Sequence, residues 1–530
     1  MSPTENASSN VTAQPDGLKT DSLAASVAVL LILTVVQRLV GFLRGVLFCR
    51  WLDADQLGQW DMAFGFLMLA APLALLGIPG SFGRYVEYYR QRHQLKTFLR
   101  RTSACSMLLM VLAMAAVALG RSWISQLVFG SAEHAGLVLL LAVSLGVVIV
   151  HNSLHSLLTA LRQVRLVCIL QFANSVAFAA AGIGLLLLWQ SSTASVVIAF
   201  AAACVLTSAV SIIYLARLWT ALPAAGPPLP QRSLWVKLMP FAFWLWLTNW
   251  LSNLFLITDR LMIIHCGGFT SQRALSLVGQ YHTARIFPVL FIGVAELLAA
   301  VVTPHLSSDW ETGQRDRVGK RLRLILKSFG LGLAAAAALV LIGAPTLFHL
   351  AWEDRFAEGL AVLPWALTCS IWTGLAFVSN NYLWCAEKSR YVNLTLAVGL
   401  LLNVLLNLLL LPYWGLLGAV LATAAARLVA LSLLWAINSN QGMQIDRGLL
   451  LVAALPLLLT LDPWISLGAI AIAVLGVVPG LRCLDATETA QLSGEAQRYG
   501  HRIRELLGRI GRRRPGDGPA TADRLSKWNG

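Results

Sequence analysis

Long apolar stretches separated by short polar loops occupy the chain from residue 23 to residue 481. A helix that crosses a bilayer needs roughly 17–25 apolar residues. Fourteen stretches qualify as candidates, and the last two are shorter and joined by a turn at Asp462 and Pro463. They are centred in 23–48, 60–80, 103–120, 135–158, 167–189, 194–216, 238–264, 276–303, 324–343, 358–384, 392–411, 415–435, 449–461 and 464–481. The pattern predicts an all-α polytopic membrane protein with about 14 transmembrane helices, the last two of which form two spans or one re-entrant hairpin.

The composition supports this class of fold. Hydrophobic residues make up 57% of the 530 residues and charged residues only 12%, with a mean hydropathy of +0.71. Soluble domains carry about 25% charged residues, so a soluble globule and a disordered chain are both excluded. The eight cysteines show no metal-ligand spacing. His151 and His155 share a helical face but lack a third ligand nearby in the sequence, so no metal site is expected.

The net charge of +15 is explained mainly by the loops. If the N-terminus is cytoplasmic, the loops on the cytoplasmic side hold 19 Lys and Arg residues and the loops on the other side hold 4. This bias predicts that both termini are cytoplasmic. A strongly basic chain can also indicate nucleic-acid binding, but the orientation of the loops explains the positive charge here. The basic tail at 483–530 is expected to contain an amphipathic helix on the membrane surface.

The two halves of the chain resemble each other. The segment Leu57-Gly58-Gln59-Trp60 is echoed by Val278-Gly279-Gln280-Tyr281, 221 residues later, and the basic loop 84–102 falls on the basic loop 305–323 at the same offset. Such matches predict two six-helix bundles related as parallel repeats, followed by two additional helices. The predicted divisions are a disordered cytoplasmic tail (1–21), the N-terminal bundle (22–217), a cytoplasmic linker (218–236), the C-terminal bundle (237–437), two additional transmembrane helices (448–482) and the basic cytoplasmic tail (483–530).

Arginines inside the predicted spans are the main candidates for function. A charge near the bilayer centre costs at least a few kcal/mol, so it needs a partner or a wet cavity. Arg38 and Arg285, one from each repeat, are expected at similar depth near the midplane, and Arg44 lies nearer the outer boundary. Guanidinium groups bind phosphate oxygens in pairs, so these three residues are candidate ligands of a pyrophosphate. The alternatives are snorkelling to a membrane surface or pairing with a buried acid.

Three further charged residues are candidates for ion coupling or for lining a cavity. Asp259, late in the seventh span, either binds a coupling cation or pairs with Arg260 or a cavity arginine. Glu296 shares a helical face with Arg285, and Arg427 lies in the twelfth span. No cofactor is expected, and the coupling alternatives are H⁺, Na⁺ and the membrane potential.

Two passages carry a resemblance to a known family. One is Arg38-Leu-Val-Gly-Phe-Leu-Arg44 continuing to Leu57-Gly58, and the other runs from Gly279-Gln-Tyr281 through Arg285 and Pro288 to Pro304-His-Leu-Ser307. The chain resembles the multidrug/oligosaccharidyl-lipid/polysaccharide flippase superfamily over about residues 23–482. Within it the chain is most similar to the oligosaccharide flippases of polysaccharide biosynthesis. The resemblance implies alternating-access transport of a polyprenyl-pyrophosphate-linked oligosaccharide across the bacterial cytoplasmic (inner) membrane, for cell-surface polysaccharide biosynthesis.

The first alternative is a lipid II (peptidoglycan precursor) flippase. Members of that branch share an arginine pair at the spacing of Arg38 and Arg44 and an arginine that corresponds to Arg285. The second span of this chain departs from that branch, because it lacks the expected basic residue and is interrupted by Pro72, Gly77 and Pro79.

The second alternative is a membrane enzyme, a polyprenyl-dependent glycosyltransferase or polymerase. Its support is the pair Asp53 and Asp55 in the first outer loop, but every outer loop is too short for a catalytic domain, so no enzyme is expected. The expected partners are the lipid-linked oligosaccharide and membrane lipids, without nucleic acid. The chain is expected to be a monomer, and a polysaccharide polymerase is the protein partner considered.

Overall fold

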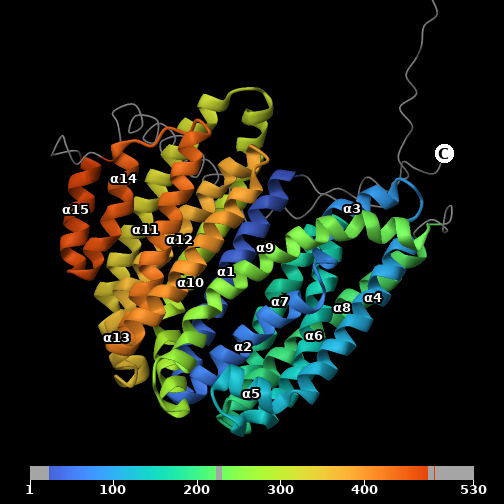
Figure 1. The fold of residues 1–530 in the computed structure, drawn as a ribbon, viewed down its shortest axis with the longest axis horizontal. Helices are drawn as coiled ribbons and strands as arrows, with labels where there is room; N and C mark the ends of the chain where they lie inside the picture. The colour runs from blue at the N-terminus through green and yellow to red at the C-terminus, as the bar shows by residue number, and fades with distance from the viewer. Residues whose placement is uncertain (1–22, 222–228, 476–482, 484–530) are drawn as a thin grey trace, which may run out of the picture. The chain divides into compact units, whose positions relative to one another are not determined.

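The computed structural model describes residues 23–221, 229–475 and 483, and every regular element in that part of the chain is a helix (Figure 1). An apolar stretch is stable in a bilayer only when its backbone groups are paired internally, which a helix achieves. The N-terminal elements are α1 (Leu23–Trp51), α2 (Ala54–Ala74), η1 (Pro79–Ser81), α3 (Phe82–Arg90), α4 (Leu95–Leu119), α5 (Arg121–Phe129), η2 (Ala132–His134), α6 (Ala135–Ala160), α7 (Val164–Leu188) and α8 (Thr193–Ala221). They are followed by α9 (Gln231–Cys266), α10 (Ser271–Glu311), α11 (Arg315–Trp352), α12 (Ala357–Cys385), α13 (Ser389–Asn440), α14 (Arg447–Ala454), η3 (Leu455–Thr460) and α15 (Pro463–Leu475).

The described residues contain ten helices long and apolar enough to cross a membrane, and a bent pair adds an eleventh candidate. The bend of 67° separates α2 from the segment Pro79–Arg90. Gly77 adopts a left-handed φ of 76° at this break, a conformation that glycine adopts without steric cost. Pro79 then starts the next helical turn, where its missing N–H is not needed. The predicted second span at 60–80 is therefore a broken one.

The helix α13 joins two predicted spans. It has 52 residues and contains Gly415 at φ 53° and ψ −132°, which lies outside the helical region and divides the helix at a kink. The predicted spans 392–411 and 415–435 correspond to the two arms. The total of fourteen spans stays a prediction, as does the cytoplasmic location of the termini, because the tails 1–21 and 484–530 lie outside the described residues.

The last predicted pair forms short helices attached to their neighbours by polar contacts. The segments Arg447–Thr460 and Pro463–Ala473 are each shorter than an ordinary span. Asp446 caps α14 by accepting a hydrogen bond from the Leu449 amide at 3.0 Å, and its other oxygen lies 2.5 Å from Nζ of the buried Lys327 in α11. Trp372 of α12 donates from Nε1 to a carbonyl near the end of α14 at 2.8 Å. Lys327, which the sequence places inside a span, thus has a structural partner.

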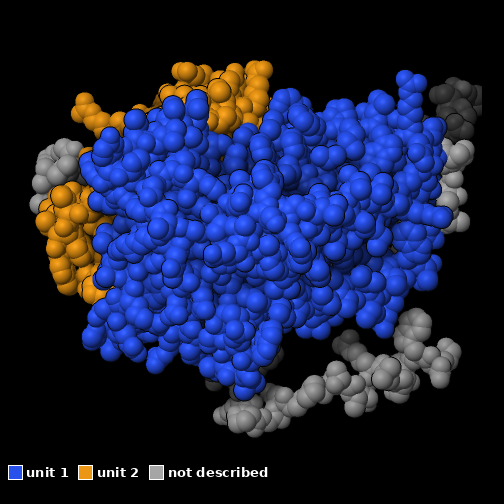
Figure 2. Space-filling view, turned by 60° about the horizontal axis from the view of Figure 1, so that its bottom comes forward, with its two compact units in different colours: residues 1–290, 347–362, 400–422 blue, residues 291–346, 363–399, 423–530 orange. Residues whose placement is uncertain are grey.

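The described chain divides into two compact units, coloured separately in Figure 2. Among the described residues, the first unit comprises those within Met1–Leu290, Leu347–Val362 and Leu400–Ala422, and the second comprises those within Phe291–Thr346, Leu363–Gly399 and Thr423–Gly530. The predicted linker 218–236 lies partly in residues that are not described. The domain boundaries derived from the sequence therefore stay predictions.

The first unit holds its helices together through apolar faces. Within it α7 packs against α1 and α8, α6 packs against α4 and α8, and α2 packs against α9. Large apolar side chains also point outward: Met107, Leu108, Val111 and Leu112 of α4 are each more than half exposed. Their spacing forms one stripe along the helix, and an exposed apolar stripe of this kind suits contact with lipid tails.

Candidate functional site

A cavity of about 520 Å³ lies within the first unit, which is in the size range of ligand pockets. Helices α1, α2, α7, α9 and α10 line it. Its polar and charged lining residues are Gln37, Arg38, Arg44, Asp61, Ser175, Asn253, Arg260, His282 and Arg285. Aromatic residues complete it: Phe42, Phe48, Trp60, Phe64 and Phe178.

The three arginines expected to bind substrate all line this one cavity. Arg38 and Arg44 lie on α1, where Gly41 and Gly45 between and beside them leave space on the same face. The guanidinium carbon of Arg44 lies 4.1 Å from the centroid of the Phe178 ring, a cation–π contact that orients its head. Arg285 enters from α10. The structure thus brings together residues from both predicted repeats, while their role in binding stays a prediction.

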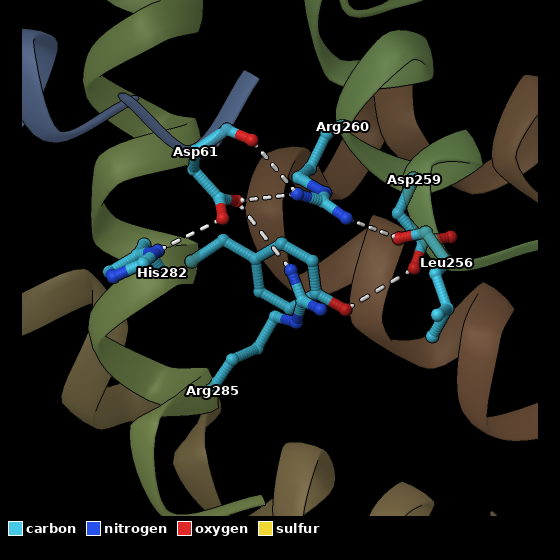
Figure 3. A network of polar contacts seen from close by, with 7 residues as sticks. Asp61, Leu256, Asp259, Arg260, His282 and Arg285 are labelled. Carbon is cyan, nitrogen blue, oxygen red and sulfur yellow. Dashed lines mark hydrogen bonds and ion pairs between the residues drawn. The ribbon is translucent and has the colours of Figure 1, made fainter. Parts of the chain in front are cut away.

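An aspartate that the sequence analysis did not identify lies at the centre of the cationic groups. Asp61 of α2 is 5% exposed, and its carboxylate is 3.0 Å from Nη1 of Arg260 and 3.5 Å from Nη1 of Arg285 (Figure 3). Nδ1 of His282 lies 3.0 Å from the second oxygen. Nη2 of Arg260 also donates to the Leu256 carbonyl at 2.7 Å. Asp61 therefore holds two arginines of α9 and α10 against α2.

The signal that identifies Asp61 is the internal repeat. Asp61 and His282 are separated by 221 residues, the same offset that relates Gly58 to Gly279. These glycines also meet: a Cβ built on either one would lie 3.1 Å from the backbone nitrogen of the other and would overlap a backbone carbonyl of the opposite helix. Equivalent positions of the two repeats therefore face each other, which places α2 and α10 in main-chain contact beside the cavity.

Asp259 and Arg260, one of the pairings considered from the sequence, have different partners in the structure. Arg260 forms its ion pair with Asp61, as described above. Asp259 is 4% exposed and accepts hydrogen bonds from Asn403 at 2.8 Å, from the Tyr281 hydroxyl at 3.2 Å and from Asn407 at 3.4 Å. The two side chains differ by about 100° in direction around α9, so these sequence neighbours contact different helices.

The other two predicted residues belong to the second unit. Glu296 is exposed on α10, and Arg427 is partly buried on the second arm of α13. Neither is among the residues that line the cavity of the first unit. Among the described residues, no group of three or more His, Cys, Asp or Glu side chains is placed to hold a metal ion.

The electrostatics of the cavity favour an anion. Four arginines and one aspartate line it, so its formal charge is +3 when His282 is neutral. Low-polarity surroundings strengthen the attraction of such a site for a negative group. Arginine forks arranged around a space of this size suit phosphate groups. The aromatic side of the cavity supplies apolar contact area next to the charges.

Solved structures with a similar fold include membrane transporters. The inward closed conformation of the lipid II flippase MurJ matches with a TM-score of 0.63 and 15% identity, covering 84% of this chain and 96% of that one. An inward-facing multidrug resistance transporter of the MATE family matches with a TM-score of 0.60 and 11% identity over 78% and 97%. A MOP superfamily transporter from Pyrococcus furiosus, whose binding pocket is described as having reverse polarity, matches with a TM-score of 0.56 and 12% identity over 79% and 94%.

These likenesses establish the fold and leave the substrate open, since the identities are low. A comparison with curated proteins gives no significant match. A family model described as polysaccharide biosynthesis protein matches residues 23–310, which include every residue that lines the cavity. Because that match covers more than half of the 530 residues, the chain belongs to the polysaccharide biosynthesis protein family, with the fold of MurJ and MATE transporters.

Proposed function

We propose that the protein is a flippase that moves a polyprenyl-pyrophosphate-linked oligosaccharide across the bacterial cytoplasmic membrane by alternating access. The observation that supports this proposal is the cavity with a formal charge of +3 among apolar helices. A diester of pyrophosphate carries one negative charge on each phosphate, so the cavity neutralises the part of the substrate that a bilayer excludes most strongly.

The arginines divide into two groups in this proposal. Arg260 and Arg285 are held by Asp61, which fixes the direction of their guanidinium groups. Arg38 and Arg44 line the cavity from the opposite helix, α1. A pyrophosphate between the two groups is bound from both sides, the oligosaccharide occupies hydrated space next to it, and the prenyl tail stays in the surrounding lipid.

Lipid II is the closest alternative substrate, and the family assignment favours an oligosaccharide. The second helix supports the same choice, because α2 presents an acidic residue, Asp61, to the cavity. An acidic group there lowers the positive charge of the site and orients neighbouring arginines. A lipid II flippase of the branch described above is expected to present a basic residue from this helix.

The enzyme alternative rests on Asp53 and Asp55. Asp53 stands at the N-terminal end of α2, its side chain is 75% exposed, and Nη1 of Arg355 lies 3.7 Å from its carboxylate. Both residues fall where acidic side chains stabilise the start of a helix. Replacing both with asparagine is therefore expected to leave transport largely intact, whereas loss of polysaccharide production with intact flipping would favour an enzyme.

Coupling to a cation is proposed at Asp259. This buried carboxylate has neutral hydrogen-bond partners, and the side-chain oxygen of Asn407 is buried next to it without a hydrogen-bond partner among the described residues. Oxygen groups of this kind suit Na⁺ or a proton. Asp259→Asn is expected to abolish the dependence of flipping on an imposed Na⁺ or H⁺ gradient, and an unchanged gradient response would refute coupling at this site.

Flipping is measured with the full chain reconstituted in liposomes. The substrate is a short-chain prenyl pyrophosphate bearing N-acetylglucosamine, and a galactosyltransferase added outside labels each sugar that reaches the outer leaflet. Arg38→Ala and Arg285→Ala are expected to lower the initial rate at least tenfold, since each removes charge-assisted hydrogen bonds to phosphate. Arg273→Ala is the matched control, because Arg273 is half exposed on the same helix as Arg285. Wild-type rates in both cavity variants would refute the proposal.

A further inference from the structure

A second cavity of about 300 Å³ lies in the first unit between α1, α6 and α7. Its lining residues are Thr34, Gln37, Arg38, His151, Gln171 and Asn174. Every one of them is polar, although the three helices are predominantly apolar. Polar groups inside a membrane protein are costly unless they find hydrogen-bond partners. The cavity is therefore suited to water or to a polar ligand.

The chemistry of this lining differs from that of the first cavity. Amides, hydroxyls and a neutral imidazole can both donate and accept hydrogen bonds, whereas guanidinium groups only donate. Phosphate oxygens need donors, which matches the arginines of the first cavity. Sugar hydroxyls need both donors and acceptors, which matches five of the six residues of the second.

A buried threonine fixes the directions of two of these side chains. Thr207 of α8 is 1% exposed, and its Oγ1 lies 3.0 Å from the Ala203 carbonyl, 3.1 Å from Nδ1 of His151 and 3.3 Å from Nδ2 of Asn174. A hydroxyl has one proton, so all three contacts are satisfied together when Thr207 donates to the carbonyl and accepts from the other two. His151 then carries its proton on Nδ1, which leaves Nε2 as an acceptor, and Asn174 keeps its side-chain oxygen as an acceptor.

The two cavities adjoin at α1, where they share lining residues. Thr34, Gln37 and Arg38 of α1 line the second cavity, and Gln37, Arg38, Gly41 and Arg44 of the same helix line the first. At about 1.5 Å per residue, Arg38 lies about 6 Å from Thr34 and about 9 Å from Arg44 along the axis. Gln37 and Arg38 line both cavities. A group attached directly to a phosphate held at Arg38 is therefore within reach of the second cavity.

From this arrangement we infer that the second cavity is a sugar subsite that binds the first sugar residue attached to the pyrophosphate, with His151, Gln171 and Asn174 as its specificity-determining residues. The inference rests on the proposed function, since it needs a pyrophosphate at Arg38. Thr207 acts as a positioning residue, because it orients His151 and Asn174 from behind. The subsite selects among sugars by the placement of their hydroxyl or acetamido groups.

The test compares binding of neryl pyrophosphate, used as its methyl diester so that it carries the same two negative charges as a sugar diester, with binding of its conjugates to glucose, galactose, N-acetylglucosamine and N-acetylgalactosamine. The full chain in nanodiscs is titrated with each probe, and the ratio of the two dissociation constants gives the gain due to the sugar. At least one sugar is expected to strengthen binding about tenfold. Asn174→Ala and Gln171→Ala are each expected to reduce that gain threefold to tenfold and to leave the dissociation constant of neryl pyrophosphate unchanged.

Two further variants make the outcome specific. Thr207→Val preserves shape and is expected to reduce the sugar gain in the same way. Ser153→Ala is expected to preserve it, because among the described residues the Ser153 hydroxyl bonds only to the Ile149 carbonyl on α6. A subsite is refuted if no conjugate binds more tightly than neryl pyrophosphate, or if Asn174→Ala keeps the full gain. Failure of neryl pyrophosphate itself to bind, or binding that Arg38→Ala does not weaken, would instead refute the proposed function.

Discussion

The ion pairs of Asp61 allow a direct test of the forces inside the cavity. The substitution Asp61→Asn removes the negative charge but keeps the shape of the side chain, so packing is nearly unchanged. In the wild-type protein the carboxylate lies 3.0 Å from Arg260, and the two side chains are 7% and 5% exposed. The variant leaves the guanidinium of Arg260 buried without that carboxylate.

The size of the effect follows from the separation and the burial. Two unit charges 3.0 Å apart attract each other by about 5.5 kcal/mol at an effective dielectric constant of about 20. Removing one partner of a buried pair costs about 3–5 kcal/mol, because the other charge stays desolvated. We therefore expect Asp61→Asn to lower the free energy of unfolding by about 3–5 kcal/mol. Adding Arg260→Met removes the buried charge as well and is expected to recover most of that loss.

The assay is urea unfolding of the purified protein in mild detergent, followed by tryptophan fluorescence and extrapolated linearly to zero urea. Asp309→Asn is the matched control, because Asp309 also forms an arginine pair, with Arg321 at 2.5 Å, but those side chains are 18% and 43% exposed. An exposed pair contributes about 1 kcal/mol or less. Equal losses in the two single variants, or an Asp61→Asn/Arg260→Met variant as unstable as the sum of its parts, would contradict this account.

Three further predictions concern the helices around and beyond the cavity. Gly279→Ala is expected to slow flipping and lower the unfolding midpoint, because its methyl group would overlap a backbone carbonyl of α2. The control is Gly319→Ala, since a Cβ at Gly319 would meet nothing within 4 Å. Equal midpoints in the two variants would disprove the close contact. Gly415→Ala is expected to cost about 1–3 kcal/mol in free energy of unfolding, because its φ of 53° disfavours a side chain; an unchanged urea midpoint would contradict the kink. Lys327→Met is expected to lower the thermal unfolding midpoint, because Asp446 loses its buried partner. Adding Asp446→Asn is expected to restore part of that loss. An unchanged midpoint in the double variant would count against the ion pair.

The helical pattern predicted the spans well where the sequence is uniformly apolar, and less well where the backbone breaks. The range 60–80 was predicted as one span interrupted by Pro72, Gly77 and Pro79, and the backbone breaks at Gly77, whose φ of 76° is left-handed. The ranges 392–411 and 415–435 were predicted as separate spans, with Pro412, Tyr413 and Trp414 between them, and the kink at Gly415 agrees with this division. The length of an apolar stretch indicates a segment that can lie in lipid, whereas a break in the helix depends on the backbone conformation of single residues.

The site was predicted in part. Arg38 and Arg285 could be paired from depth alone, since position along a helix is fixed by residue number. Asp61 could not be found in this way, because its partners come from two helices some 200 residues away in the sequence. The adjacency of Asp259 and Arg260 suggested a pair, but neighbours on a helix point in different directions. Partner choice across helices depends on rotation about each axis, which a single sequence does not specify.

The contact between Gly58 and Gly279 bears on how a chain of this kind arises. The two glycines occupy the same place in their repeats and face each other, which is the geometry of a symmetric dimer interface. A half-length chain with one such glycine would already make this contact with a second copy of itself. Gene duplication and fusion would then join two partners whose interface existed beforehand. After fusion the two repeats are encoded separately, so equivalent positions can mutate independently. Positions 61 and 282 are equivalent in the two repeats, and they now hold an aspartate and a histidine that contact each other.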